Sequence, residues 1–120
     1  MLNKDRDLFR LGHILECTEK ISILVEKVKD YEAFEQKWIE QDAMIRNFEI
    51  IGEASHHVSD ETKQKYPEIE WYKIRGMRNF MTHEYFGIRL MTIWDTAETD
   101  IPILKSQIKK IIADLGKTEQ

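Results

Sequence analysis

Polar and charged side chains gather in residues 71–89, WYKIRGMRNFMTHEYFGIR, where Arg78, Asn79, His83 and Tyr85 fall within eight residues of one another. Arginine presents a planar fork of donors that suits phosphate oxygens, and histidine exchanges protons near neutral pH. Together they could cut an RNA backbone without a metal ion. His83 would move protons, and Arg78 would neutralise the charge that builds on phosphorus.

Three more cations, Lys73, Arg75 and Arg89, flank this group. Counted with Arg78 against Glu84, they give the stretch a charge of +3, whereas the chain has a formal net charge of -4. We expect Lys73, Arg75 and Arg89 to bind RNA beside the catalytic pair, because a local positive field attracts a polyanion. The alternative is that these residues are ordinary solvated side chains, since short runs with arginine and histidine also arise by chance.

The spacing of the two candidate catalytic residues limits how they can meet. Arg78 and His83 are five positions apart, about 140° around an ideal helix, so they would not share a face. Asn79 and His83, at i and i+4, would share one, and Asn79 could then orient His83 or bind the phosphate. Arg78 and His83 converge only if the helix ends near His83, for which Gly87 is a candidate stop, or if a second subunit completes the site.

A metal centre is not predicted, and no cofactor is expected. Glu84 follows His83 directly, without a carboxylate pair or a second histidine at ligand spacing. The adjacent His56 and His57 would point about 100° apart on a helix, so we interpret them as solvated residues near a helix C-terminus. Tyr85 could pack on a neighbouring aromatic ring or stack on an RNA base.

The elements that must position these residues are helical. Apolar residues recur at helical spacing and no strand is predicted, which favours a bundle of about four or five helices. Residues 31–39 are ambiguous, and fit best as the first turns of the second helix. Pro102 predicts either a kink or a new helix capped by Thr99 or Asp100. The expected helices cover residues 4–31, about 31–58, 60–65 (capped by Ser59 or Asp60), 68 or 71 to about 83, and about 90–115.

Length and composition indicate a single domain over residues 1–120, with an apolar fraction of 42%. A domain of this size gains stability from dimerisation. Gly52, inside the second expected helix, predicts a close approach of another helix. The lone cysteine, Cys17, predicts a buried side chain and a reducing, cytoplasmic setting. No signal peptide or membrane span is recognisable, so we expect no membrane contact.

Residues 78–85 read R-x4-H-x-Y, and this pattern resembles the signature of the HepT-like toxins of the HEPN superfamily. The resemblance covers nearly the whole chain. It implies an all-α, HEPN-type homodimer that acts as a metal-independent endoribonuclease toxin, cleaving RNA at the dimer cleft through Arg78 and His83. It extends to the blocks RDLFRLGHILECTEKI, QDAMIRNFEIIGEAS, KYPEIEWYKIRGMRN and IWDTAETDIPILKSQI.

The resemblance also implies a partner, a minimal nucleotidyltransferase antitoxin of the MntA type, which transfers AMP to Tyr85. The attached phosphodiester would add negative charge and bulk two residues from His83, and it would compete with RNA for Arg78. The alternative function is a non-catalytic helical module that holds a nucleotidyltransferase or its nucleotide, with Arg78 and His83 binding phosphate.

Overall fold

The computed structural model describes residues 3–80 and 90–117, and within these ranges every regular element is helical. The predicted all-α bundle is therefore confirmed, while the homodimer stays a prediction. In chain order the elements are α1 (Asn3–Val28), α2 (Tyr31–Phe34), α3 (Trp38–His56), α4 (Asp60–Lys65), α5 (Trp71–Gly76), the 3-10 turn η1 (Met77–Asn79), α7 (Leu90–Asp95), the π-helical turn η2 (Thr96–Asp100) and α8 (Ile101–Lys117).

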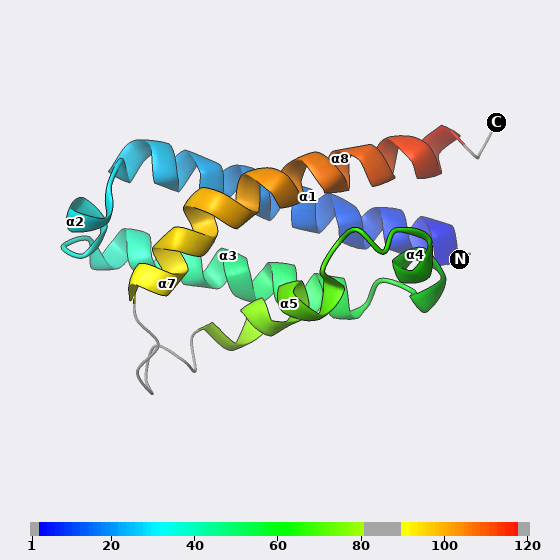
Figure 1. The fold of residues 1–120 in the computed structure, drawn as a ribbon, viewed down its shortest axis with the longest axis horizontal. Helices are drawn as coiled ribbons and strands as arrows, with labels where there is room; N and C mark the ends of the chain where they lie inside the picture. Colours follow the sequence, from blue (N-terminus) through cyan, green and yellow to red (C-terminus); the bar gives the residue numbers. More distant parts are fainter. Residues whose placement is uncertain (1–2, 81–89, 118–120) are drawn as a thin grey trace.

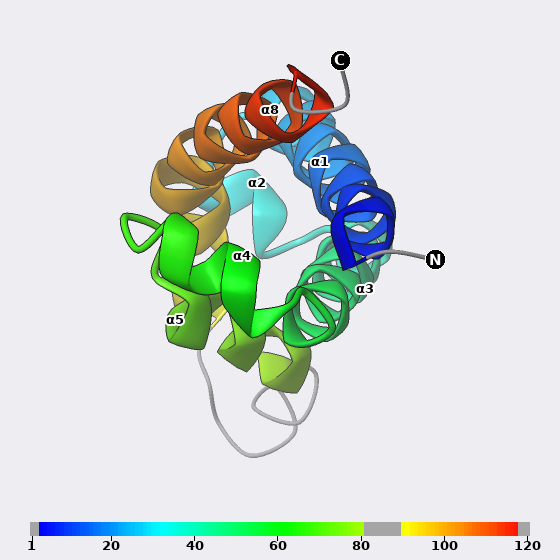
Figure 2. The ribbon, with the colours of Figure 1, turned by 90° about the vertical axis from the view of Figure 1, so that its right-hand side faces the viewer.

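Three long helices, α1, α3 and α8, form the body of the molecule, which measures 49 × 27 × 23 Å (Figure 1). Helices α1 and α3 run antiparallel, and α8 returns along α1. Seen from one end, the helices surround a common interior, with α4 and α5 beside α3 (Figure 2). Because α5 and η1 pack mainly on α3, the position of that helix fixes the position of Arg78.

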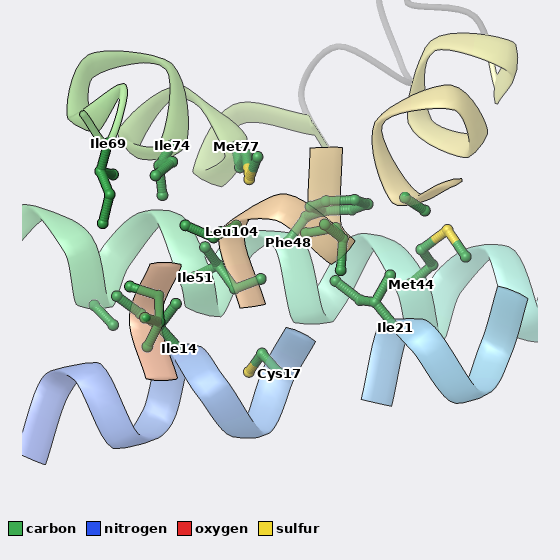
Figure 3. Packing of buried hydrophobic residues seen from close by; sticks show 14 of the residues in the cluster. Ile14, Cys17, Ile21, Met44, Phe48, Ile51, Ile69, Ile74, Met77 and Leu104 are labelled. Atoms are coloured by element: carbon green, nitrogen blue, oxygen red, sulfur yellow. The ribbon is translucent and has the colours of Figure 1, made fainter. Parts of the chain in front are cut away.

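The core lies between these helices (Figure 3). Helix α1 buries a stripe that includes Leu11, Ile14 and Ile21, all fully covered. Cys17 is buried in the same stripe, as predicted. From the opposite side, Ile74 and Met77 of the α5–η1 segment point toward α3. These apolar anchors hold the polar motif residues against the bundle, since burial of apolar surface is the main favourable term in folding.

The connection between α1 and α3 corrects the interpretation of residues 31–39. Residues 31–37 are not the first turns of α3 but a separate helix, α2, followed by a turn, and only Trp38 and Ile39 belong to α3. Lys29 ends α1 in the left-handed region, with φ of 82°. Asp30 then caps α2 by accepting a hydrogen bond from the Ala33 amide at 2.8 Å. Gln41 secures the new helix, because its Nε2 donates to the Phe34 carbonyl at 2.8 Å.

A buried carboxylate, Asp7, ties α1 to the start of α4. Its oxygens accept hydrogen bonds from the Ser59 amide at 2.9 Å, from the Ser59 hydroxyl at 2.6 Å and from the Thr62 hydroxyl. Ser59, rather than Asp60, is the N-cap of α4, since its hydroxyl also accepts from the Thr62 amide at 3.3 Å. A charged acceptor bonded this way satisfies donors that would otherwise be costly to bury.

The helix passes through Pro102 without a break. Helices α7 and α8 are joined by the π-helical turn η2, and together they form one curved rod (Figure 1). Proline lacks an amide hydrogen, and a π-helical turn is one way in which a helix accommodates a lost backbone hydrogen bond. In place of the predicted kink at Pro102, the helix widens locally at η2. Thr99 does not cap a new helix, because its hydroxyl donates back to the Asp95 carbonyl at 2.6 Å.

None of the described helices combines the length and apolarity needed to cross a bilayer.

Candidate functional site

The motif segment lies directly against α3 at Gly52. A Cβ atom at this position would stand 2.4 Å from the Arg78 amide nitrogen, 2.8 Å from the Arg78 Cβ and 2.9 Å from the Arg75 carbonyl oxygen. Real side chains do not tolerate such distances, so only glycine allows this approach. The predicted close contact at Gly52 is confirmed. Gly76 differs, since a Cβ built there meets nothing within 4 Å among the described residues.

Arg78 is held loosely by a carboxylate of α3. Its Nη1 lies 3.7 Å from Oε2 of Glu53, whose side chain is exposed, and the Arg78 side chain is itself partly exposed. The other oxygen of Glu53 lies 3.1 Å from Nε2 of His57. An exposed pair of this kind contributes at most about 1 kcal/mol, so a phosphate oxygen can compete for the guanidinium. The carboxylate therefore orients Arg78 without blocking it.

Arg78 and Asn79 border a cavity of about 440 Å³ whose other walls come from α1 and α3. These further walls are not evident from the sequence. Their residues are i, i+3 pairs, RLGH on α1 and RNFE on α3. Such spacing predicts that each pair shares a helix face, but it does not say that the two faces meet. The charged and imidazole side chains added by the two helices are Arg10, His13, Arg46, Glu49 and Glu53.

Two of the predicted supporting residues lie beside Arg78. Arg75, Arg78 and Asn79 line a second cavity of about 300 Å³ together with Tyr72, whose side chain is 91% exposed. The structure thus brings Arg75, Arg78 and Asn79 together on one surface of the α5–η1 segment. The large exposed ring of Tyr72 next to two arginines gives this surface the composition typical of sites that bind nucleic acid or another protein.

Lys73 does not lie on the surface formed by Arg75, Arg78 and Asn79. Its Nζ is 3.1 Å from Oδ2 of Asp100, and a hydrogen bond to that carboxylate raises the pKa of Lys73 above its usual value. The two residues line a different, smaller cavity of about 80 Å³ between α5 and α8. The structure therefore does not bring Lys73 together with Arg78, and the described contact of Lys73 is structural.

The electrostatic effect of the arginines is visible at His56. Arg75 lowers the pKa of His56 below its ordinary value, and partial desolvation, Arg78 and His57 act in the same direction. Glu53 opposes them. Both histidines are exposed, as interpreted from the sequence. The lowered pKa of His56 follows from the position of Arg75 and Arg78 near the C-terminal end of α3.

His83, Tyr85 and Arg89 lie outside the described residues. The convergence of His83 with Arg78, the role of Tyr85 as an AMP acceptor and the binding of RNA by Arg89 therefore remain predictions. Within residues 3–80 and 90–117, no group of three or more His, Cys, Asp or Glu side chains is arranged to hold a metal ion.

Comparison with known proteins identifies the family. A family model described as ribonuclease HepT-like matches residues 14–111. The chain belongs to the HepT-like ribonuclease family. The match includes Arg46, Arg78 and His83 but begins after Arg10. No solved structure matches this HepT-like chain.

Individual relatives agree with the family. A Methanocaldococcus jannaschii protein named "Putative RNase" is 38% identical over 91% of this HepT-like chain and 90% of its own length. A Thermococcus cleftensis protein named "Probable ribonuclease HepT" is 35% identical over 82% of this chain and 92% of its own. A second M. jannaschii protein, named "Gamma-glutamylcyclotransferase and putative RNase", is 37% identical over 98% of this chain, which spans only 52% of that relative.

Proposed function

We propose that this chain is the metal-independent endoribonuclease toxin of a toxin–antitoxin system, with Arg78 and His83 as its catalytic residues. The observation that carries the proposal is the position of Arg78 within a family-matched chain. It lies at the border of a cavity that holds further arginines, with only a weak carboxylate contact at 3.7 Å. An arginine that is positioned but still available to a phosphate is what stabilisation of a charged transition state needs.

The proposed reaction uses the nucleophile that RNA carries. The 2′-hydroxyl oxygen attacks phosphorus and loses its proton to a histidine, and the bond from phosphorus to the 5′-oxygen breaks. The leaving oxygen takes a proton from a second acid, giving a 2′,3′-cyclic phosphate and a 5′-hydroxyl. Arg78 balances the added negative charge on the non-bridging oxygens, and Asn79 hydrogen-bonds either the phosphate or His83.

The need for two proton-transfer groups supports a symmetric homodimer, in which His83 of each subunit faces one shared cleft. Exposed apolar side chains are compatible with such an interface. Trp38 and Ile39 are 67% and 61% exposed, and Tyr72, next to Arg75, is 91% exposed. Trp38 and Ile39 are neighbours at the start of α3, and an exposed apolar pair of this size is compatible with a surface that binds a partner.

Cleavage in the presence of EDTA tests the activity. We expect the wild-type chain to cut single-stranded RNA in EDTA and to leave cyclic phosphate ends, because no step uses a metal ion. His83→Ala should lower the rate about 10²–10⁴-fold, since a proton-transfer residue contributes about that much. End-group analysis and gel assays measure both results. RNA that stays intact with pure wild-type protein would favour a non-catalytic module that binds a nucleotidyltransferase.

Control of the toxin is proposed to act at Tyr85. A partner nucleotidyltransferase would use ATP and magnesium, the tyrosine oxygen would attack the α-phosphorus, and pyrophosphate would leave. The AMP phosphodiester would then compete with RNA for Arg78. Tyr85→Phe removes only the acceptor oxygen. We expect this variant to cut RNA but to escape silencing by the partner and ATP.

Intact-mass spectrometry measures the modification directly. The wild type should gain AMP and Tyr85→Phe should gain none, while Tyr72→Phe serves as the matched control and should be modified like the wild type. If Tyr85→Phe is modified and silenced as readily as the wild type, Tyr85 is not the acceptor.

A further inference from the structure

Two arginines from different helices face the same cavity without an acidic partner. Arg10 of α1 and Arg46 of α3 both line the cavity of about 440 Å³ that Arg78 borders. In the described part of the chain, neither guanidinium has a carboxylate within ion-pair distance, although Arg10 lies 5.8 Å from the centre of the Phe9 ring. Like charges that converge on one cavity repel each other, so the arrangement is suited to an anion that bridges them.

A carboxylate oxygen in the wall of this cavity also lacks a partner. Oε1 of Glu49 is inaccessible to solvent and has no hydrogen-bond partner among the described residues. Burying such an acceptor without a donor is unfavourable, and an orphaned buried polar atom calls for an explanation. Because Oε1 has no accessible surface, a ligand reaches it only when the Glu49 side chain turns into the cavity that it lines. A carboxylate oxygen can only accept, so that ligand must bring a hydroxyl or an amino group.

The combination fits a nucleotide better than a bare anion. The cavity is within the size range of sites that take small organic ligands. Next to Arg10, the exposed rings of Phe9 and His13 lie 4.5 Å apart, and exposed aromatic rings are platforms on which unpaired bases stack. The phosphate of a nucleotide thus matches the two arginines, and a hydroxyl or amino group of its sugar or base matches Glu49. The base itself matches the aromatic rings, and all of these groups lie along one stretch of surface.

We propose that Arg10, Arg46 and Glu49 form a second nucleotide subsite for single-stranded RNA. The two arginines hold the phosphate next to the one at Arg78, and Glu49 accepts a hydrogen bond from the same nucleotide. The inference rests on the proposed function, because it takes RNA as the ligand. It extends the binding surface from the motif segment across α3 to α1, so that the bundle itself contributes to substrate recognition.

Binding of a fluorescently labelled single-stranded RNA tests whether Arg10 and Arg46 hold a phosphate. The His83→Ala chain is used throughout, so that the strand stays intact, and affinity is read by anisotropy at several salt concentrations. In that background Arg10→Gln and Arg46→Gln should each weaken binding about tenfold, the effect of losing one charge-assisted hydrogen bond. Each should also reduce the slope of log affinity against log salt by about 0.7, the value for one phosphate on a single strand.

A charge-matched variant controls for general electrostatics. Lys109→Gln removes one exposed positive charge from α8, which contributes no residue to the cavity. It should leave both the affinity and the salt slope unchanged. If Arg10→Gln and Arg46→Gln bind like Lys109→Gln, the subsite does not exist.

The role of Glu49 is tested by whether its substitution weakens or tightens RNA binding. Removing a negative charge from the cavity would by electrostatics alone tighten the binding of a polyanion. The subsite predicts the opposite for Glu49→Leu, which loses the acceptor, and it predicts that Glu49→Gln, which keeps an acceptor oxygen, restores binding. Tighter binding by Glu49→Leu would overturn the role of Glu49, and a DNA strand of the same sequence shows whether the donor is the 2′-hydroxyl or the base.

The two proposals fail in different ways. Wild-type chain that binds RNA through Arg10 and Arg46 but leaves it uncut in EDTA would overturn the ribonuclease activity and support the subsite. Wild-type chain that cuts RNA, with no change of affinity in Arg10→Gln or Arg46→Gln, would overturn the subsite alone.

Discussion

Arg78→Ala is expected to lower kcat for RNA cleavage about 10²–10³-fold, the usual effect of removing one donor from a charged transition state. The free energy of unfolding should change by less than about 1 kcal/mol. Arg78 is half-exposed and its ion pair with Glu53 spans 3.7 Å, so the substitution leaves no core cavity and breaks only a weak contact. Single-turnover kinetics and a urea melt measure the two quantities.

Two further variants separate catalysis from the ion pair. Arg78→Lys keeps the charge but loses the planar fork, so it should recover only part of the activity. Glu53→Gln removes the partner of Arg78 and keeps Arg78 itself, so its kcat should stay within a few fold of the wild type. A loss in Glu53→Gln as deep as that in Arg78→Ala would mean that the pair, rather than the guanidinium, is what matters.

Gly52→Ala is expected to damage stability and activity together. The new Cβ would lie 2.4 Å from the Arg78 amide nitrogen and 2.9 Å from the Arg75 carbonyl oxygen. Both atoms belong to the backbone, so no side-chain rotation relieves the overlap, and α5 and η1 must move away from α3. Overpacking of this kind costs about 1–3 kcal/mol, and a displacement of Arg78 by about 1 Å can cost about 100-fold in rate.

Gly12→Ala and Gly76→Ala are the matched controls, because a Cβ at either position meets nothing within 4 Å among the described residues. In the interior of α1, Gly12→Ala should raise stability by as much as about 1 kcal/mol, the propensity difference between the two residues. Thermal melts and cleavage rates of the three variants give the comparison. Equal stability and rate for Gly52→Ala and Gly12→Ala would contradict the close packing of η1 on α3.

The sequence predicts the long helices well, because their apolar residues recur at helical spacing over many turns. Gly52 also predicts its close contact, because glycine destabilises the interior of a helix and a close approach of another segment is the main reason to find it there. Residues 31–39 show the limit. Asp30, which could begin a turn or cap a helix, does both here, and the position of α2 depends on Gln41 seven residues beyond Phe34. Tertiary packing decided a choice that local preference left open.

The candidate site is only partly encoded in one stretch. Arg75, Arg78 and Asn79 come together because they are neighbours on the same short segment, which the sequence makes evident. Arg10 and Arg46 could not be assigned to the same cavity, because their meeting depends on how α1 lies along α3. Lys73 looked equivalent to Arg75 in sequence, yet its partner Asp100 comes from a distant element, η2.

The hydrogen bonds of Asp7 have a consequence for the order in which the molecule opens. They join positions 52 and 55 residues apart, so they can form only after α1 and α3 have docked. Helix α4 spans six residues, too few to persist without that support. When these hydrogen bonds are lost, α4 should therefore be among the first segments to unfold locally, and α5 follows it along the chain. By holding α4 in place, Asp7 thus protects the α5–η1 segment, which carries Arg78, against local unfolding while the rest of the bundle stays folded.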